Sequence, residues 1–135
     1  MQFFDIATRG QGLYDFTQDV VAWVNGQGNG VVTLFVRHTS ASLLIQENAD
    51  PEVQTDLKIY FARLLPPSTD PSIVYLTHTN EGPDDMPAHI KAAIMPVSLQ
   101  IPVESGRMVL GTWQGIYLFE HRDAPKIRHV AAQFL

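Results

Sequence analysis

Short apolar runs with the composition of β-strands make up most of the chain. Residues 31–37 (VVTLFVR) are β-branched and aromatic, which is typical of a buried strand, and residues 41–46 (ASLLIQ) are predicted to be its neighbour. Gly106 can adopt a positive φ, so the stretch around it is predicted to form a tight hairpin turn. Further strands are predicted at residues 2–7, 97–103, 108–110, 116–122 and 127–134.

Three stretches carry the signals of helices, at residues 17–26, 50–65 and 84–95. Asp50 and Pro51 form a helix start, and apolar residues recur after them at spacings of three and four, so this helix is expected to lay one apolar face on the core. Thr17 is predicted to cap the first helix. Strands outnumber helices and do not alternate with them, which predicts an α+β fold: a mostly antiparallel sheet with two or three packed helices. The length predicts one domain covering residues 1–135.

The charge balance narrows the classes of partner. The formal net charge is −5 and the basic residues are scattered, which argues against nucleic acids and acidic membrane surfaces as partners. No apolar stretch approaches the ~20 residues of a membrane span. The first residues show no secretory signal, so a cytoplasmic location is expected.

The histidines are the first candidates for chemistry. The chain has no cysteine, so any metal must be held by histidine nitrogens and by carboxylate or amide oxygens. His38, His78, His89 and His121 fall at predicted strand ends or helix starts, where polar groups can converge on one cleft. A turn between His78 and His89 can bring both rings to one point, as an open metal site requires. The spacing matches no established metal motif, so half-exposed histidines without a ligand remain the alternative.

The acidic residues beside the helix starts allow two interpretations. Asp84 and Asp85 would complement the dipole at a helix N-terminus, and one of them could also point at a metal or substrate. Glu47 and Asn48 precede the helix that starts at Pro51 and have the same ambiguity. Ser42 lies near His38, but no glycine-flanked elbow accompanies it, which disfavours a serine hydrolase.

Five segments, taken together, resemble the YjbQ family (UPF0047), whose members are described as secondary thiamine-phosphate synthases. They are residues 38–51, 81–91, 98–102, 110–116 and 120–122, and the resemblance extends over essentially the whole chain. It implies an α+β fold assembled as a homotrimer, with a site at the boundary between subunits. The implied side reaction joins a pyrimidine pyrophosphate to a thiazole phosphate and releases pyrophosphate, while the primary reaction is unknown.

The resemblance also implies that a set of polar residues lies in one cleft, and we expect the following roles for them. The expected metal ligands are His38, His78 and His89, for a divalent ion that is zinc, or magnesium or manganese. The expected catalytic groups are Glu47, Asp84, Asp85 and His121. The expected contacts to a small phosphorylated metabolite are Asn48, Lys91, Glu120 and Arg122, with Lys91 and Arg122 as the phosphate contacts.

Three functions follow from these residues. The first is a metal-dependent enzyme of unknown primary reaction with a secondary thiamine-phosphate synthase activity. The second is a trimeric binding module that holds a phosphorylated metabolite without turnover, which the absence of a recognisable nucleophile favours. The third is a structural or interaction protein in which the histidines are incidental.

Overall fold

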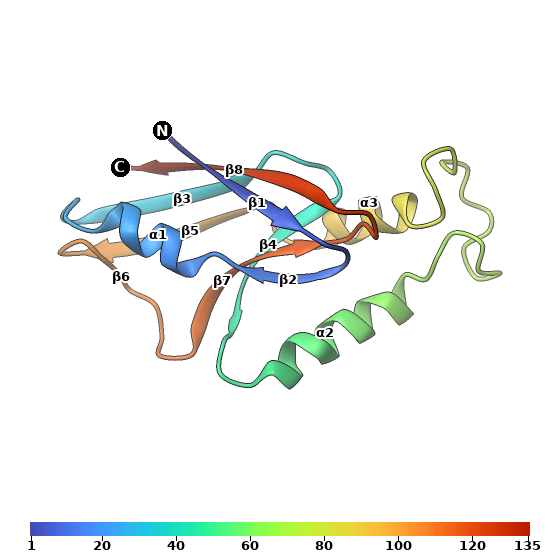
Figure 1. The fold of residues 1–135 in the computed structure, drawn as a ribbon, viewed down its shortest axis with the longest axis horizontal. Helices are drawn as coiled ribbons and strands as arrows, with labels where there is room; N and C mark the ends of the chain where they lie inside the picture. Colours follow the sequence, from blue (N-terminus) through green and yellow to red (C-terminus); the bar gives the residue numbers. More distant parts are fainter.

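Eight strands form two antiparallel sheets in the computed structural model, which describes residues 1–135 (Figure 1). The larger sheet has the order β1 (Gln2–Thr8), β8 (Lys126–Phe134), β3 (Gly30–Val36), β5 (Ser98–Glu104) and β6 (Arg107–Met108). The smaller sheet has the order β2 (Gly12–Asp15), β7 (Gln114–Glu120) and β4 (Ala41–Glu47). Every strand pair is antiparallel, which confirms the expected α+β class.

The core lies between the two sheets and follows from the alternation of side chains along the strands. In β3, Val32 and Leu34 are fully buried, while Val31 and Phe35 on either side of them are exposed. In β7, Leu118 points into the same core, and apolar residues from both sheets complete it. Burying one face of each sheet in this way is the main stabilising term of the fold.

Helix α1 (Thr17–Val24) starts differently from the prediction. Phe16 occupies the N-cap position, and the side chain of Asp15 accepts hydrogen bonds from both the backbone N–H and the hydroxyl of Thr17. The expected cap at Thr17 is therefore wrong. The Thr17 hydroxyl instead accepts a hydrogen bond of 2.8 Å from the backbone N–H of Ile116, which ties α1 to β7.

Helix α2 (Pro51–Leu64) begins as predicted, because Asp50 accepts a hydrogen bond from the backbone N–H of Glu52 and Pro51 is the first helical residue. Its packing does not match the prediction, since no residue of α2 is fully buried. Phe61 contacts Phe119 with ring centroids 5.8 Å apart, so the helix packs on the outer side of the smaller sheet. Figure 1 shows α2 and the loop after it extending beyond the sheets.

The remaining differences concern short elements. The sequence did not predict β2, whose four residues include a glycine. The strand expected at 108–110 is reduced to β6, and the turn before it contains Ser105 and Gly106 with φ of 51° and 75°. Helix α3 (Asp85–Ile94) lies close to its predicted range. None of the three helices has the length and apolar character needed to cross a membrane.

A buried ion pair joins the two sheets at one end. Glu120, at the end of β7, is fully buried, and its carboxylate accepts hydrogen bonds from the Arg128 guanidinium of β8 and from the Thr8 hydroxyl of β1. It also accepts from the backbone N–H groups of His121 and Arg122, at 3.0 and 3.1 Å. Burial alone would raise the pKa of Glu120, but these hydrogen bonds outweigh it and the pKa is lowered.

We expect Glu120→Gln to lower the free energy of unfolding by about 3–5 kcal/mol, because it leaves the Arg128 charge buried without a counter-charge. Urea denaturation at neutral pH measures the loss. Glu104→Gln is the matched control on an exposed strand end, with an expected effect within about 0.5 kcal/mol. A loss below about 1 kcal/mol for Glu120→Gln would contradict this role.

The effect of Glu120→Gln depends on pH in a defined direction. A carboxyl whose pKa is lowered by folding stabilises the protein above its ordinary value of 4.5, and this contribution is lost as the pH falls through the lower folded value. The difference in stability between wild type and Glu120→Gln therefore shrinks in acid. Denaturation curves at neutral pH and below pH ~4 measure the change, and a difference that grows in acid would contradict it.

Candidate metal centre

Four side chains converge where the long loop after α2 meets α3. His78 and Glu81 come from the loop, and Asp85 and His89 come from the first turns of α3. One ligand atom from each lies within 4.8 Å of the others. Asp85 and His89 share one face of the helix because they are four residues apart, and Gly82, with φ of 110°, turns the loop back toward that face.

The buried carboxylate of Asp85 lies at the base of this cluster. Its Oδ2 is 2.7 Å from His78 Nε2 and 3.3 Å from His89 Nε2, while Glu81 Oε2 is 3.4 Å from His78 Nε2. The Asp85 side chain is 2% exposed, against 29% for His89, 49% for His78 and 63% for Glu81. The cluster is therefore closed on the side of Asp85 and open to solvent on the side of His78 and Glu81. A metal site that keeps a coordination position for substrate needs such an open side.

The ring of His89 is held in a defined orientation. Its Nδ1–H donates a hydrogen bond of 2.9 Å to the carbonyl of Thr39, in the bend between β3 and β4. In a neutral imidazole this leaves the Nε2 lone pair free, on the side that faces Asp85. A hydrogen bond on the second nitrogen is the usual way in which proteins fix a histidine that ligates metal.

Arg122 fixes the acidic side of the cluster. Its Nη1 donates to Asp85 Oδ1 at 2.7 Å, its Nε donates to Asp84 Oδ2 at 2.9 Å, and its Nη2 donates to the Glu81 carbonyl at 2.9 Å. The guanidinium, expected to contact phosphate, is thus occupied by three protein oxygens within the chain. Asp84 also accepts from the backbone N–H of Asp123, so it anchors Arg122 and lies outside the group of converging ligands.

These contacts keep Asp85 ionised. Burial alone would raise the pKa of Asp85, but the hydrogen bond with His78 and the charge on Arg122 outweigh it, and the pKa is lowered. Asp84 behaves in the same way, with burial opposed by hydrogen bonds from Asp123 and Arg122 that lower its pKa. An ionised, buried carboxylate beside two imidazoles is a strong attractor for a cation.

His38 lies outside the cluster. Its Nε2 accepts a hydrogen bond of 2.9 Å from the backbone N–H of His129, and the two rings stack with centroids 5.4 Å apart. Burial, followed by the charges of Arg128 and His129, lowers the pKa of His38. The structure thus brings together two of the three expected histidine ligands, while His38 lines a cavity that also borders His89.

Two of the expected site residues are sealed in the interior. Glu120 and His121 are fully buried, and Glu120 belongs to the ion pair with Arg128. His121 Nε2 is 2.9 Å from the Ser42 hydroxyl, and its Nδ1 has no hydrogen-bond partner. Burial, with the charges of Lys91 and Arg128, lowers the pKa of His121 to about 3, so its ring is neutral at physiological pH.

Lys91, Glu47 and Asn48 lie apart from the converging ligands within this chain. Lys91 is buried, donates to Gln11 Oε1 at 2.9 Å, and borders a separate cavity of about 210 Å³. Glu47 ends β4 opposite Gln114, at the other end of the strand pair from Glu120. Asn48 follows it directly, and its backbone N–H donates to the Trp113 carbonyl.

Glu81 is the member of the cluster that the sequence did not assign to the site. It lies in a loop, where no periodicity shows which way a side chain points. The signal that could have found it is the spacing of His78, Glu81, Asp85 and His89, with intervals of three, four and four residues. Those intervals repeat as they would on one helix face, although only the last two residues are helical.

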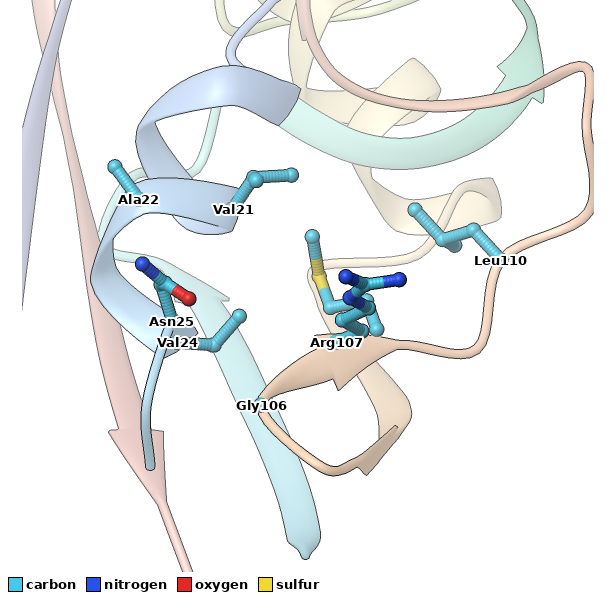
Figure 2. A pocket seen from close by; sticks show the side chains of 8 residues that line it. Val21, Ala22, Val24, Asn25, Gly106, Arg107 and Leu110 are labelled. Carbon is cyan, nitrogen blue, oxygen red and sulfur yellow. The ribbon is translucent and has the colours of Figure 1, made fainter. Parts of the chain in front are cut away.

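A third cavity of the molecule has no titratable cluster of this kind. It has a volume of about 370 Å³ and lies between α1 and the β6 hairpin, lined mainly by apolar side chains such as Val21, Met108 and Leu110 (Figure 2). Arg107 is its one charged residue. No histidine or carboxylate borders it, so it lacks the groups of the cluster at α3.

The fold and the cluster define a small two-sheet α+β protein with a candidate metal centre of two histidines and two carboxylates. The family model described as UPF0047 protein YjbQ-like matches residues 2–135. The chain therefore belongs to the YjbQ (UPF0047) family, in agreement with the resemblance seen in the sequence. The function of this family is uncharacterised.

Relatives and solved structures agree with this assignment. The chain is 51% identical over 127 residues to UPF0047 protein sll1880 of Synechocystis, covering 93% of this chain and 84% of that protein. It is 46% identical to UPF0047 protein YjbQ of Escherichia coli O157:H7, over 76% of this chain and 71% of that one. The crystal structure of the conserved hypothetical protein TT1486 from Thermus thermophilus is 34% identical, with a TM-score of 0.86 and full coverage of both chains.

The role of Arg122 can be tested without any ligand. We expect Arg122→Met to lower the free energy of unfolding by about 1.5–3 kcal/mol, because the carboxylates of Asp84 and Asp85 lose charged donors in a partly buried place. Chemical denaturation measures this loss. Arg107→Met is the matched control, since Arg107 is exposed and makes no ion pair. Equal effects of the two substitutions would contradict the role assigned to Arg122.

Proposed function

We propose that this protein is a metal-dependent enzyme that acts on a small phosphorylated metabolite, with the metal held by His78, Glu81, Asp85 and His89. The observation that carries the proposal is the convergence of these four ligand atoms within 4.8 Å, around a buried carboxylate. The fixed orientation of the His89 ring supports it, because histidines that ligate a metal usually donate the second ring N–H to an oxygen in this way.

The ligand set restricts the choice of metal. Two imidazole nitrogens with one or two carboxylate oxygens suit zinc and also manganese or ferrous iron, whereas magnesium prefers oxygen ligands alone. Zinc is therefore the first ion to test and manganese the second. The bound ion would act as a Lewis acid toward a phosphoryl oxygen or a leaving pyrophosphate.

The residues of the chain supply the rest of the proposed machinery. Glu81, the most exposed of the four, would complete the ligand set from the solvent side of the site. Asp85 and Arg122 hold the base of the site in place. The secondary thiamine-phosphate synthase reaction fits these requirements, since the departure of pyrophosphate needs positive charge next to it.

A non-catalytic binding module is the second candidate, and one observation favours it. Ser42 and His121 are the only serine–histidine side-chain pair joined by a hydrogen bond, and both are sealed in the interior. No covalent nucleophile therefore stands at the open cluster. A site that binds a phosphorylated metabolite and releases it unchanged has the same ligands and no turnover.

The exposed apolar surface of α2 supports a homotrimer as part of this proposal. Ile59, Tyr60 and Leu64 are about half exposed or more, and so are Val74 and Tyr75 in the following loop. Side chains of this kind that cluster on one side of a protein mark an interface with another subunit. The loop after α2 also carries His78 and Glu81, so such an assembly would place the candidate metal centre beside a subunit boundary.

Metal titration tests the first part of the proposal. We expect wild-type protein to bind about one zinc ion per chain. His89→Ala removes a direct ligand, so it should weaken zinc binding by more than the roughly 10–100-fold that is lost when a residue hydrogen-bonded to a ligand is replaced. Isothermal titration calorimetry measures both, and His129→Ala is the matched control outside the cluster. At a hundred times the dissociation constant, zinc should stabilise wild type by about 2.7 kcal/mol, reversibly with chelator. If neither zinc nor manganese binds or shifts Tm, the proposal is wrong.

The assembly can be tested by one substitution on α2. We expect Tyr60→Arg to convert a trimer into monomers, because it places a charge where apolar side chains would meet. Light scattering after gel filtration measures the mass. Lys58→Glu, on the polar side of the same helix, is the control and should leave the mass unchanged. A wild-type protein that is monomeric at high concentration would contradict the trimer.

A further inference from the structure

A cavity of about 400 Å³ lies against the side of His89 that faces away from the cluster. Its walls come from the end of β3, the bend after it, and one face of α3, and they are mainly apolar. The lining side chains include Phe35, Val36, Ala92, Ala93 and Val97, together with His38, Thr39 and His89. This volume lies in the range of small-molecule sites, which are mostly apolar with a few polar groups.

His89 connects the cavity to the candidate metal centre. Its Nε2 faces Asp85, and its Nδ1 donates to the Thr39 carbonyl in the wall of the cavity. His89 therefore borders both the cluster and the apolar space, and a ligand that reaches around this one ring would contact both.

Two donors give the cavity polarity. His38 Nε2 already accepts from the backbone N–H of His129, so the neutral ring carries its proton on Nδ1. The Nδ1–H of His38 and the hydroxyl of Thr39 have no partner within the chain. An apolar space with two donors at its edge suits a ring or a short apolar body that carries an acceptor.

We propose that this cavity binds the organic part of the substrate, an apolar body of the size of one aromatic ring, while the anionic head of the same molecule lies at the metal. The inference rests on the proposed metal-dependent function and adds the substrate class to it. His38, expected from the sequence to ligate the metal, is here a specificity-determining residue in the neighbouring cavity.

Two phosphonates that differ only in the ring test this assignment. Methylphosphonate carries the anionic head alone, and benzylphosphonate carries the same head with a phenyl ring. On zinc-loaded protein we expect benzylphosphonate to bind at least about ten-fold more tightly than methylphosphonate. The reason is that the apolar surface of the phenyl ring is removed from water when the ring enters the cavity. Calorimetry measures both affinities, and equal affinities overturn the proposal.

A substitution inside the cavity locates the ring. Ala93→Leu fills the cavity from an exposed position of α3, and we expect it to reduce the ratio of the two affinities to about one. Ala22→Leu makes the same change on α1, at the cavity of Figure 2, and the ratio should stay at the wild-type value. A ratio that survives Ala93→Leu overturns the proposal.

NMR separates failure of this proposal from failure of the metal site. In metal-free protein at higher ligand concentration, benzylphosphonate should still shift the amide signals of Thr39, Ala93 and Val97, and Ala93→Leu should abolish these shifts. If zinc does not bind but the shifts appear, the proposed function fails and the cavity assignment holds. If zinc binds and the shifts are absent, the cavity assignment fails, as it also would if a second copy of the chain covered the cavity.

Discussion

The ion pair between Glu120 and Arg128 is the interaction on which the arrangement of this protein depends. It joins the two sheets at one end, and the same carboxylate accepts the backbone N–H groups of His121 and Arg122. These hydrogen bonds to the buried carboxylate therefore fix the direction in which the chain leaves β7. Arg122 emerges there in position to hold Asp85, so a buried pair far from solvent fixes the base of an open site. Compared with apolar residues of the same volume such a pair adds little net stability, although removing one partner is costly, so its value here is geometric.

The candidate metal centre combines one rigid half with one exposed half. Asp85 and His89 are held by α3, by Arg122 and by the Thr39 carbonyl, whereas His78 and Glu81 come from a loop and face solvent. Charge attracts a cation to such a site, but the rigid half determines where the cation would lie. The exposed half leaves room for exchange of ligands, as the proposed catalysis on a phosphorylated compound would require.

The sequence predicted most elements because their signals are local. The β-branched run in β3 and the Asp50–Pro51 start of α2 need only neighbouring residues to be recognised, and both were correct. The packing of α2 was not predictable, since periodicity shows which face is apolar and not what covers it. His78 and His89 were expected together because eleven residues and a turn separate them. The position of His38 depends on the long-range pairing of strands, which composition does not reveal. His38 lies beside His129 of β8, outside the cluster.

The weak attachment of α2 has a consequence for the dynamics of the native state. A helix with no fully buried residue can open locally at a small fraction of the global unfolding free energy, while the sheets remain folded. Its amide hydrogens would then exchange with solvent through sub-global fluctuations, in contrast to the slow exchange expected for β3 and β7 at the centre of their sheets. We therefore expect α2, which adjoins the loop that carries His78, to unfold locally before the sheets do.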